Sequence, residues 1–439
     1  MYKRILVANR GAIARRVIRA CNELGVESVA VYSDADADAP YLAEASQSIH
    51  LPGVTATDTY LNQEVLFQAM ADAKADALHP GYGFLSEHAG FARAINAREL
   101  AFIGPDARWL ESMGDKVAAR KTMGEQGFPT FPGSTALKDV ADALDQADKI
   151  GYPVMLKPSG GGGGMGMQRV DTPEQLETKF HQAQAVAQQA FSNADVYLEK
   201  CLNTPRHIEY QILADNAGQV MHVFERECSV QRRHQKLIEE SPAPGLDPEI
   251  IAEVAGQAVA ACTRLGYNNV GTLETLYDAS SGTGFLEMNT RIQVEHGVTE
   301  MVTGLDLVQT QIRLAAGDAL PPTPERHGVA IEARLYAEDS DTLLPSTGKL
   351  SRFHIPQLHG IRVDTGFAQG QSVTPYYDAL LAKVISHAPT RELAIGRLVV
   401  ALKAIEVQGV RTNAPLLTRI LTSDAFLSGD IDTSLLNRL

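Results

Sequence analysis

The sequence has little cysteine and a shortage of positive charge. Its four cysteines (Cys21, Cys201, Cys228 and Cys262) lack C-x-x-C spacing, which argues against a zinc site or disulfide framework and predicts buried free thiols. Against 53 aspartate and glutamate residues stand 39 lysine and arginine residues, giving a formal net charge of −14. Nucleic acid is therefore not an expected partner, because phosphate backbones are bound by clustered lysine and arginine.

Long hydrophobic runs are also missing. No apolar stretch approaches the length of a membrane span, and the run near Ile5 is too short for a signal peptide. We therefore expect a cytoplasmic protein without a membrane partner. A chain of 439 residues is too long to form a single compact core. We expect an N-terminal domain, a helical connector, a small subdomain and a larger C-terminal part, at 1–103, 104–129, 130–201 and 202–439.

Short apolar runs alternate with helical patterns in the first part. The runs at 4–8, 28–33, 75–80 and 101–104 are typical of buried strands. Between them, "GAIARRVIRACNELG" has apolar residues on one helical face and a polar face with Arg15, Arg16, Arg19, Asn22 and Glu23. Strands alternating with helices predict an α/β fold with a parallel, doubly wound sheet.

The rest of the chain carries helical and antiparallel patterns. Residues 107–127 predict a helical connector, and 152–158 and 195–200 predict strands around a polyglycine run. Two hairpins are predicted beyond 202, and a helical tail follows 388. The hairpins pair 206–215 with 219–230 and 271–279 with 284–295.

Five consecutive glycines occur in "KPSGGGGGMGM" (157–167). A Walker A loop is excluded because no lysine follows the glycines. A flexible linker remains possible, as does a glycine-rich flap whose bare N–H groups lie over nucleotide phosphates. The run alone leaves both interpretations open.

Polar residues alternate with apolar ones in "FLEMNTRIQVE" (285–295). On a strand, one face would carry the apolar residues and the other face Glu287, Asn289, Arg291, Gln293 and Glu295. The hairpin turn at 280–284 would bring Glu274 opposite Glu287. Clustered carboxylate and amide oxygens suit Mg²⁺ shared with phosphates. The alternative is a solvated strand with cross-strand ion pairs.

Seven motifs together resemble the biotin carboxylases of the ATP-grasp superfamily, over essentially the whole chain. They are "ILVANRGAIA" (5–14), "HPGYGFLSE" (79–87), "MGDK" (113–116), "SGGGGGMGM" (159–167), "RHIEYQ" (206–211), "CSVQRRHQKLIEESPAP" (228–244) and "EMNTRIQVEH" (287–296). The resemblance implies a Rossmann-like N-terminal sheet, an ATP-grasp fold with a mobile lid and a C-terminal antiparallel-sheet domain. It also implies a ligase that carboxylates biotin with bicarbonate and ATP through carboxyphosphate. This is the first half-reaction of acetyl-CoA carboxylase, in fatty acid biosynthesis, or of a related acyl-CoA carboxylase.

The resemblance also implies residue roles. ATP contacts would come from Lys116, Lys157, Gly162, Gly163, Gly164, Gly166, Met167, Glu199, Lys200, Leu202, His207, Gln231 and His234. Mg²⁺ or Mn²⁺ would be bound by Glu274, Glu287 and Asn289. Glu295 would deprotonate bicarbonate in a pocket made by Lys236, Arg291, Gln293 and Val294. Arg334 would stabilise the biotin enolate, and Tyr82 and Gly83 would contact biotin. Lys236, Arg291, Glu295 and Arg334 form the expected catalytic group.

Partners follow in the same way. The sequence has no Met-Lys-Met biotinylation motif, so we expect biotin on a separate carrier protein, together with a carboxyltransferase. The resemblance implies a homodimer through Arg16, Arg19, Glu23 and Arg362. The alternative for the helix residues is a solvated face.

Four positions depart from the commonest family pattern: Ala12, Pro158, Met165 and Gly297. No matched catalytic residue is missing, so we expect an active enzyme. A urea-carboxylase-like component, another ATP-grasp ligase with a different acceptor, and a nucleotide-binding regulatory subunit without turnover remain as alternatives.

Overall fold

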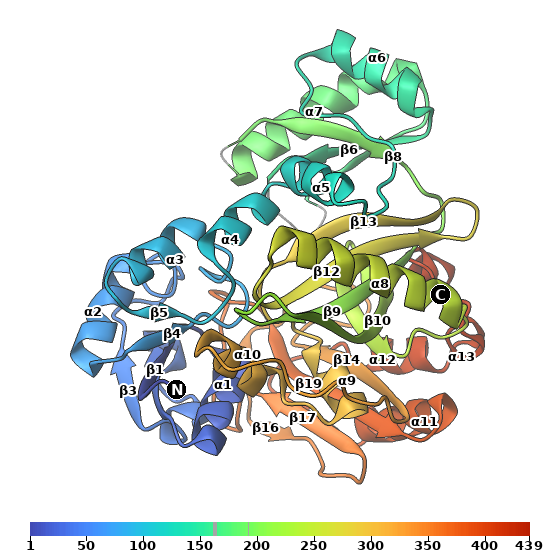
Figure 1. Cartoon of the computed structure of the whole chain (residues 1–439). Coiled ribbons are helices and arrows are strands. Elements are labelled where there is room, and N and C mark those ends of the chain that lie inside the picture. Colours follow the sequence, from blue (N-terminus) through green and yellow to red (C-terminus); the bar gives the residue numbers. More distant parts are fainter. Residues whose placement is uncertain (161–164, 192) are drawn as a thin grey trace.

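The computed structural model describes residues 1–160, 165–191 and 193–439 (Figure 1). The N-terminal part contains a five-stranded sheet of order β3-β2-β1-β4-β5, and every neighbouring pair is parallel. Its strands are β1 (Arg4–Val7), β2 (Glu27–Tyr32), β3 (Gln47–His50), β4 (Ala77–His79) and β5 (Ala101–Phe102). The helices are α1 (Gly11–Leu24), α2 (Gln63–Ala73) and α3 (Ala89–Asn96), with the 3₁₀ turns η1 (Asp34–Asp36) and η2 (Pro40–Ala43). The predicted parallel, doubly wound sheet is confirmed.

One residue of α1 differs from the prediction. The helical pattern predicts Arg16 on the polar face, yet it is only 3% exposed. Its Nη2 lies 2.8 Å from Glu300 and 2.5 Å from Asp306, so two carboxylates compensate the buried charge. A solvated face is therefore wrong for Arg16.

The connector consists of two helices rather than one. Helix α4 (Ala107–Gly114) and α5 (Lys116–Glu125) meet at Asp115, whose backbone is extended. The Asp115 carboxylate accepts a 2.7 Å hydrogen bond from the Ala118 N–H and caps α5. This break places Lys116 at the first position of α5.

The small subdomain projects away from the rest of the chain at the top of Figure 1. Its antiparallel sheet has the order β7-β6-β8. The elements are α6 (Val140–Ile150), β6 (Val154–Pro158), β7 (Gln168–Val170), α7 (Pro173–Phe191) and β8 (Val196–Lys200). A hydrophobic core of its own, including Leu156, Phe180 and Leu198, stabilises this subdomain.

An eight-stranded antiparallel sheet forms the centre of the molecule, in the order β13-β12-β9-β10-β11-β14-β19-β17. Both predicted hairpins are present, as β9 with β10 and β12 with β13. The strands are β9 (Arg206–Ala214), β10 (Val220–Arg232), β11 (Gln235–Ser241), β12 (Asn269–Asp278), β13 (Gly282–Asn289), β14 (Val329–Tyr336), β17 (Ile361–Thr365) and β19 (Leu380–Ala388).

Helices and short strand pairs surround this sheet. The helical tail predicted after 388 is present as α11 and the helices that follow it. The helices are α8 (Pro248–Leu265), α9 (His296–Thr303), α10 (Leu307–Ala315), α11 (Arg391–Lys403), α12 (Ala414–Leu421), α13 (Asp424–Ser428) and η3 (Leu435–Arg438). The short strands are β15 (Gly348–Lys349), β16 (Arg352–His354), β18 (Ser372–Val373) and β20 (Glu406–Gln408).

The predicted strand through residue 295 is wrong in its second half. Strand β13 ends at Asn289, residues 290–295 are irregular with a turn only at 294–295, and α9 begins at His296. Ile292 is fully buried in a hydrophobic core that the N-terminal part shares with the large sheet and α10, and this burial takes the chain away from the edge of the sheet. Val294, predicted on the apolar face, is half-buried and borders the main cavity.

In the described part of the chain, no helix combines the length and apolar character required to cross a membrane.

Candidate functional site

The main cavity lies where the N-terminal part, the small subdomain and the large sheet meet, and has a volume of about 880 Å³. That is within the range of ligand sites. It brings together most of the residues predicted from the sequence: Tyr82, Gly83, Lys116, Lys157, Met167, Lys200, Leu202, His207, Gln231, His234, Lys236, Glu274, Glu287, Asn289, Arg291, Gln293, Val294, Glu295 and Arg334.

Two predicted residues that the structure describes, Glu199 and Gly166, are not part of this lining. Glu199 lies behind it, buried and ion-paired with Lys157. Gly166 borders Pro158 and Val186 of the small subdomain instead of the cavity. Gly162, Gly163 and Gly164 lie outside the described residues.

Glu274 and Glu287 lie next to each other on neighbouring strands, as the sequence predicts. The two residues are directly opposite each other in the β12–β13 pair. Glu287 contacts Lys116 at 2.8 Å, and Glu274 lies 2.7 Å from Nε2 of His207. Burial opposes the charge of Glu287, but Lys116 outweighs it, so the pKa of this carboxyl is lowered. Each carboxylate of the pair therefore has a cationic or ring-nitrogen partner in place.

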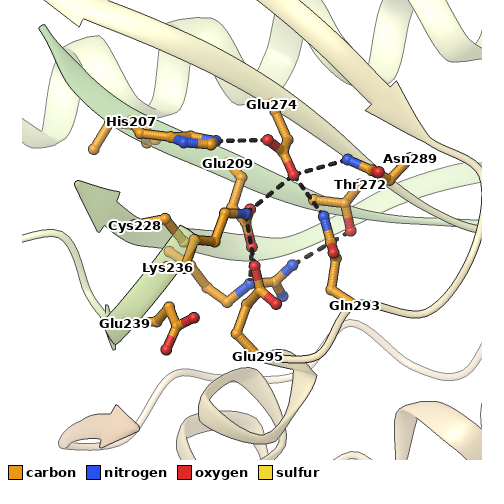
Figure 2. Close-up of polar contacts among 12 residues, drawn as sticks. His207, Glu209, Cys228, Lys236, Glu239, Thr272, Glu274, Asn289, Gln293 and Glu295 are labelled. Atoms are coloured by element: carbon orange, nitrogen blue, oxygen red, sulfur yellow. Dashed lines mark hydrogen bonds and ion pairs between the residues drawn. The ribbon is translucent and has the colours of Figure 1, made fainter. Parts of the chain in front are cut away.

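Glu274 is the centre of a dense set of contacts (Figure 2). Its Oε1 accepts from Nδ2 of Asn289 at 2.7 Å, from Nε2 of Gln293 at 2.6 Å and from Nζ of Lys236 at 3.1 Å. Burial disfavours the charge of Glu274, yet Lys236 and His207 lower its pKa well below the usual range. The carboxylate is thus ionised in the buried site.

Lys236 lies among three carboxylates. Its Nζ contacts Glu209 at 2.6 Å, Glu295 at 2.7 Å and Glu274 at 3.1 Å. Burial alone would lower the pKa of Lys236, but these carboxylates raise it well above its usual value. Lys236 is therefore a fixed positive charge at the base of the cavity.

Glu295 lies between two cations. Its Oε1 is 2.7 Å from Lys236 and its Oε2 is 3.0 Å from Arg334. Burial works against the charge, but Lys236, Arg334 and Arg226 outweigh it and lower the pKa of Glu295. The carboxylate is ionised and borders the cavity, as a proton acceptor must be.

Arg291 lines the cavity and is oriented by three neighbours. It donates to Glu87 at 3.0 Å, to Gln293 Oε1 at 2.7 Å and to Asn289 Oδ1 at 2.6 Å. These contacts aim one guanidinium at the cavity beside the carboxylates. A guanidinium so oriented suits a planar anion such as bicarbonate.

A second group of basic residues lines the cavity at the end next to the small subdomain. Lys157 on β6 is ion-paired with Glu199 on β8, and Lys200 donates to the carbonyl of Gly151 at 2.7 Å. Burial, together with Lys157 and Lys116, lowers the pKa of His234, so that imidazole is neutral. Lysines facing a cavity beside a neutral ring suit a nucleotide with its phosphates.

Sequence reasoning missed two buried residues beneath the cavity, Glu209 and Arg226. The Nε of Arg226 lies 2.5 Å from Glu209, and both residues are completely buried. A signal was available, because His207, Glu209 and Gln211 alternate with apolar residues on β9.

The lower end of the cavity also has residues that the sequence analysis did not select. Tyr336, Tyr376, Tyr377 and Asp378 line it together with Arg10, whose guanidinium lies 4.4 Å from the centre of the Tyr377 ring. The polar and aromatic "TPYYD" segment (374–378) was a usable signal. These side chains border the end at which Tyr82 and Arg334 lie.

The donor set fits a divalent cation. Glu274 and Glu287 offer ionised oxygens of the kind that Mg²⁺ and Mn²⁺ prefer. Asn289 differs, because its amide nitrogen faces Glu274 while its oxygen accepts from Arg291. Asn289 therefore presents an oxygen to a metal only if the amide turns over.

Family comparisons cover nearly the whole chain. Residues 1–110 match the biotin carboxylase N-terminal domain, and residues 332–438 match the biotin carboxylase C-terminal domain. Residues 115–323 match the ATP-binding domain of the carbamoyl-phosphate synthase L chain.

Individual relatives agree with this result. Biotin carboxylase 2 of Bacillus subtilis (strain 168) is 46% identical over 442 residues, covering 100% of both chains. A Campylobacter jejuni biotin carboxylase in complex with β-γ-ATP has a TM-score of 0.98 and 41% identity, covering 100% of this chain and 99% of the other. The biotin carboxylase domain dimer of Hydrogenobacter thermophilus 2-oxoglutarate carboxylase, with MgADP, ADP and bicarbonate, has a TM-score of 0.97 and 44% identity, covering 100% and 98%. The chain therefore belongs to the biotin carboxylase family of ATP-grasp enzymes.

Proposed function

We propose that this chain uses ATP and bicarbonate to carboxylate biotin carried on a separate protein. The observation that carries the proposal is the single cavity in which Glu274, Glu287, Arg291 and Glu295 meet. Charged groups suited to a metal-bound nucleotide lie at one end, and groups suited to bicarbonate lie beside them. The likeness to chains solved with MgADP and bicarbonate supports this assignment.

The nucleotide occupies the end of the cavity lined by Lys116, Lys157, Lys200 and His207 in this proposal. The lysines neutralise phosphate charge, and Leu202 and Met167 supply apolar surface for the base. Bound Mg²⁺ or Mn²⁺, held by Glu274 and Glu287, would neutralise charge on the transferred phosphoryl group.

Bicarbonate binds against Arg291, Gln293, Val294 and Lys236, and Glu295 removes its proton. Two anions side by side raise each other's pKa, so bound bicarbonate offsets the effect of Lys236 and Arg334 on Glu295. The proton moves from the bicarbonate oxygen to the Glu295 carboxylate, and the carbonate oxygen attacks the terminal phosphate. The product of this step is carboxyphosphate, with ADP as leaving group.

Biotin reaches the other end of the cavity, near Tyr82, Gly83 and Arg334. Asn9 Nδ2 donates 2.7 Å hydrogen bonds to the carbonyls of Pro80 and Tyr82, which orients this loop. Arg334 lies 3.0 Å from Glu295 and can stabilise negative charge developing on the ureido group. The bicarbonate position and the biotin end of the cavity thus share the Glu295–Arg334 contact.

The partners of the proposed enzyme are a biotin carrier protein and a carboxyltransferase, with acetyl-CoA or another acyl-CoA as final acceptor. A homodimer is supported by the dimer of the Hydrogenobacter thermophilus relative. Arg19 and Glu23 are exposed on α1 and available to a second subunit, whereas Arg16 and Arg362 both contact Glu300 within the chain. A cytoplasmic location agrees with four buried free cysteines.

Bicarbonate-dependent ATP hydrolysis, measured with and without free biotin, tests the proposal. Stimulation by biotin is the expected result. Hydrolysis that requires an amine, an amino acid or urea instead would assign a different acceptor. Tight ATP binding without turnover under any acceptor would indicate a regulatory subunit and overturn the proposal.

A further inference from the structure

Two glutamates next to the cavity are buried face to face. Glu239 on β11 and Glu332 on β14 are directly opposite each other in the antiparallel register, and both are 0% exposed. Residues so paired have Cβ atoms about 4.5–5.5 Å apart on the same face of the sheet. Two ionised carboxylates at such a position repel each other strongly.

The pair has few partners for its oxygens. Within the described part of the chain, no donor makes an aligned hydrogen bond to any of the four carboxylate oxygens. Arg334 Nη2 approaches Glu239 Oε1 to 2.5 Å, and Lys383 Nζ lies 3.9 Å from Glu332 Oε2. By contrast Glu240, the next residue on β11, has two guanidinium contacts from Arg391, at 2.7 and 3.0 Å.

Both cations are also shared with other carboxylates. Arg334 lies 3.0 Å from Glu295, and Lys383 lies 3.6 Å from Asp364. The titratable and charged groups around the pair come from every adjacent element. They are Lys236 on β11, Arg226 and Cys228 on β10, Arg334 and Tyr336 on β14, Lys383 on β19, Asp364 on β17, Glu295 and His296 at the start of α9, and Tyr82 before α3.

This surrounding charge does not support two negative charges on the pair. Burial raises the pKa of Glu239, and Arg334 only partly opposes this effect. Burial also raises the pKa of Glu332, with Lys383 opposing and Glu239 reinforcing the shift. One proton on the pair removes the repulsion and supplies a hydrogen-bond donor between the carboxyls.

The pair connects to the reaction through one guanidinium. The same Nη2 of Arg334 contacts Glu239 and Glu295, so Arg334 lies between the pair and the base. Figure 2 shows Glu239 on the same side of the sheet as Glu295. A single negative charge on Glu239 balances the attraction of Arg334 to Glu295. A second negative charge, on Glu332, would draw Arg334 away from the cavity.

We propose that Glu239 and Glu332 share one proton, and that this pair positions Arg334, with Glu332 as the neutral member and Glu239 as the charged one. The role in turnover rests on the proposed function of Arg334, whereas the shared proton does not. Neither glutamate touches a substrate in this proposal. Both act through Arg334.

Infrared difference spectroscopy tests the shared proton without reference to turnover. Wild-type protein at neutral pH is expected to show the carbonyl band of a buried protonated carboxyl, and E332Q is expected to lack it. The control is E240Q. Glu240 lies on the same strand, and both of its carboxylate oxygens contact Arg391, so this variant should retain the band. Absence of the band from the wild-type protein, or its persistence in E332Q, overturns the proposal.

Kinetics test the positioning role. E239Q removes the anion beside Arg334, so the biotin-stimulated rate should fall about ten- to hundredfold, while the KM for ATP and the biotin-independent rate change little. E332Q fixes the neutral form, so it should keep biotin stimulation in alkaline buffer, where the wild-type protein loses it as the pair ionises. Equal losses in ATP affinity and biotin stimulation in E239Q, or the same alkaline loss in E332Q as in wild type, refute the positioning role. A wild-type protein without biotin stimulation refutes the proposed function instead, and the infrared result then stands alone.

Discussion

Replacing Glu295 with glutamine changes one charge and almost no volume. The substitution removes the anion that lies 2.7 Å from Lys236 and 3.0 Å from Arg334. Lys236 keeps Glu209 at 2.6 Å, and Arg334 keeps Glu239 at 2.5 Å. Because neither cation is left alone, we expect the E295Q protein to fold.

The expected loss is in the chemical step. General base catalysis contributes about 10²–10⁴-fold, which corresponds to about 3–5 kcal/mol of activation free energy. Bicarbonate-dependent turnover by E295Q should fall by that factor, while ATP affinity stays within about threefold because no proposed ATP contact changes. The cost in folding free energy should be below the ~3–5 kcal/mol of an orphaned buried charge.

Turnover is measured as bicarbonate-dependent ATP hydrolysis, and ATP affinity by calorimetry. A suitable control is E225Q, since Glu225 is a buried carboxylate on β10 that is paired with Arg326 at 2.7 Å and does not line the cavity. The control should lose stability and keep its rate. Turnover of E295Q close to wild type would show that another group accepts the proton.

Three further predictions concern stability and metal dependence. Glu300 is buried, but Arg16 and other nearby cations lower its pKa to about 2, so its stabilising effect is present above its ordinary pKa of 4.5 and is lost as the pH falls toward 2. Between these two pH values the unfolding free energy of the wild-type protein should fall by about 3 kcal/mol more than that of E300Q. Urea titrations at several pH values measure this difference. An alanine Cβ at position 366 would lie 2.3 Å from the carbonyl carbon of Gly11, so G366A should lower the Tm, whereas G396A on α11 meets no atom within 4 Å and should raise stability by up to about 1 kcal/mol. Chelation of divalent cations by EDTA should stop ATP turnover, and added Mg²⁺ or Mn²⁺ should restore it; undiminished turnover in EDTA would contradict the metal assignment.

Local patterns were sufficient to predict the parallel sheet and both hairpins. The apolar run at Ile5–Val7 and the one-sided apolar face of α1 are set by neighbours in sequence, and the structure retains both. The register of Glu274 with Glu287 follows from a short turn, which leaves the two strands little freedom. Such features depend on few residues and short separations.

Long-range contacts account for what the sequence did not predict. The period-2 pattern continues past Asn289, but Ile292 is buried against residues that are distant in sequence. No local pattern predicts that contact. Arg16 has the sequence context of a solvated helix face, and its carboxylate partners Glu300 and Asp306 are distant in sequence. Glu209 is different, because a local signal for it exists: His207, Glu209 and Gln211 alternate with apolar residues on β9.

The register of the large sheet explains how so many charges fit in one buried site. Glu287, Glu274, Glu209 and Arg226 are successive partners across β13, β12, β9 and β10, so they form one row on adjacent strands. Three neighbouring carboxylates in a row are unfavourable unless cations separate them. Lys116 contacts Glu287, Arg226 contacts Glu209, and Lys236 contacts both Glu274 and Glu209, so each carboxylate of the row has a cation beside it. A divalent cation added to this row brings excess positive charge, and the phosphates of a nucleotide supply the compensating negative charge. The charge balance of the row therefore favours binding of metal and nucleotide together over binding of either alone.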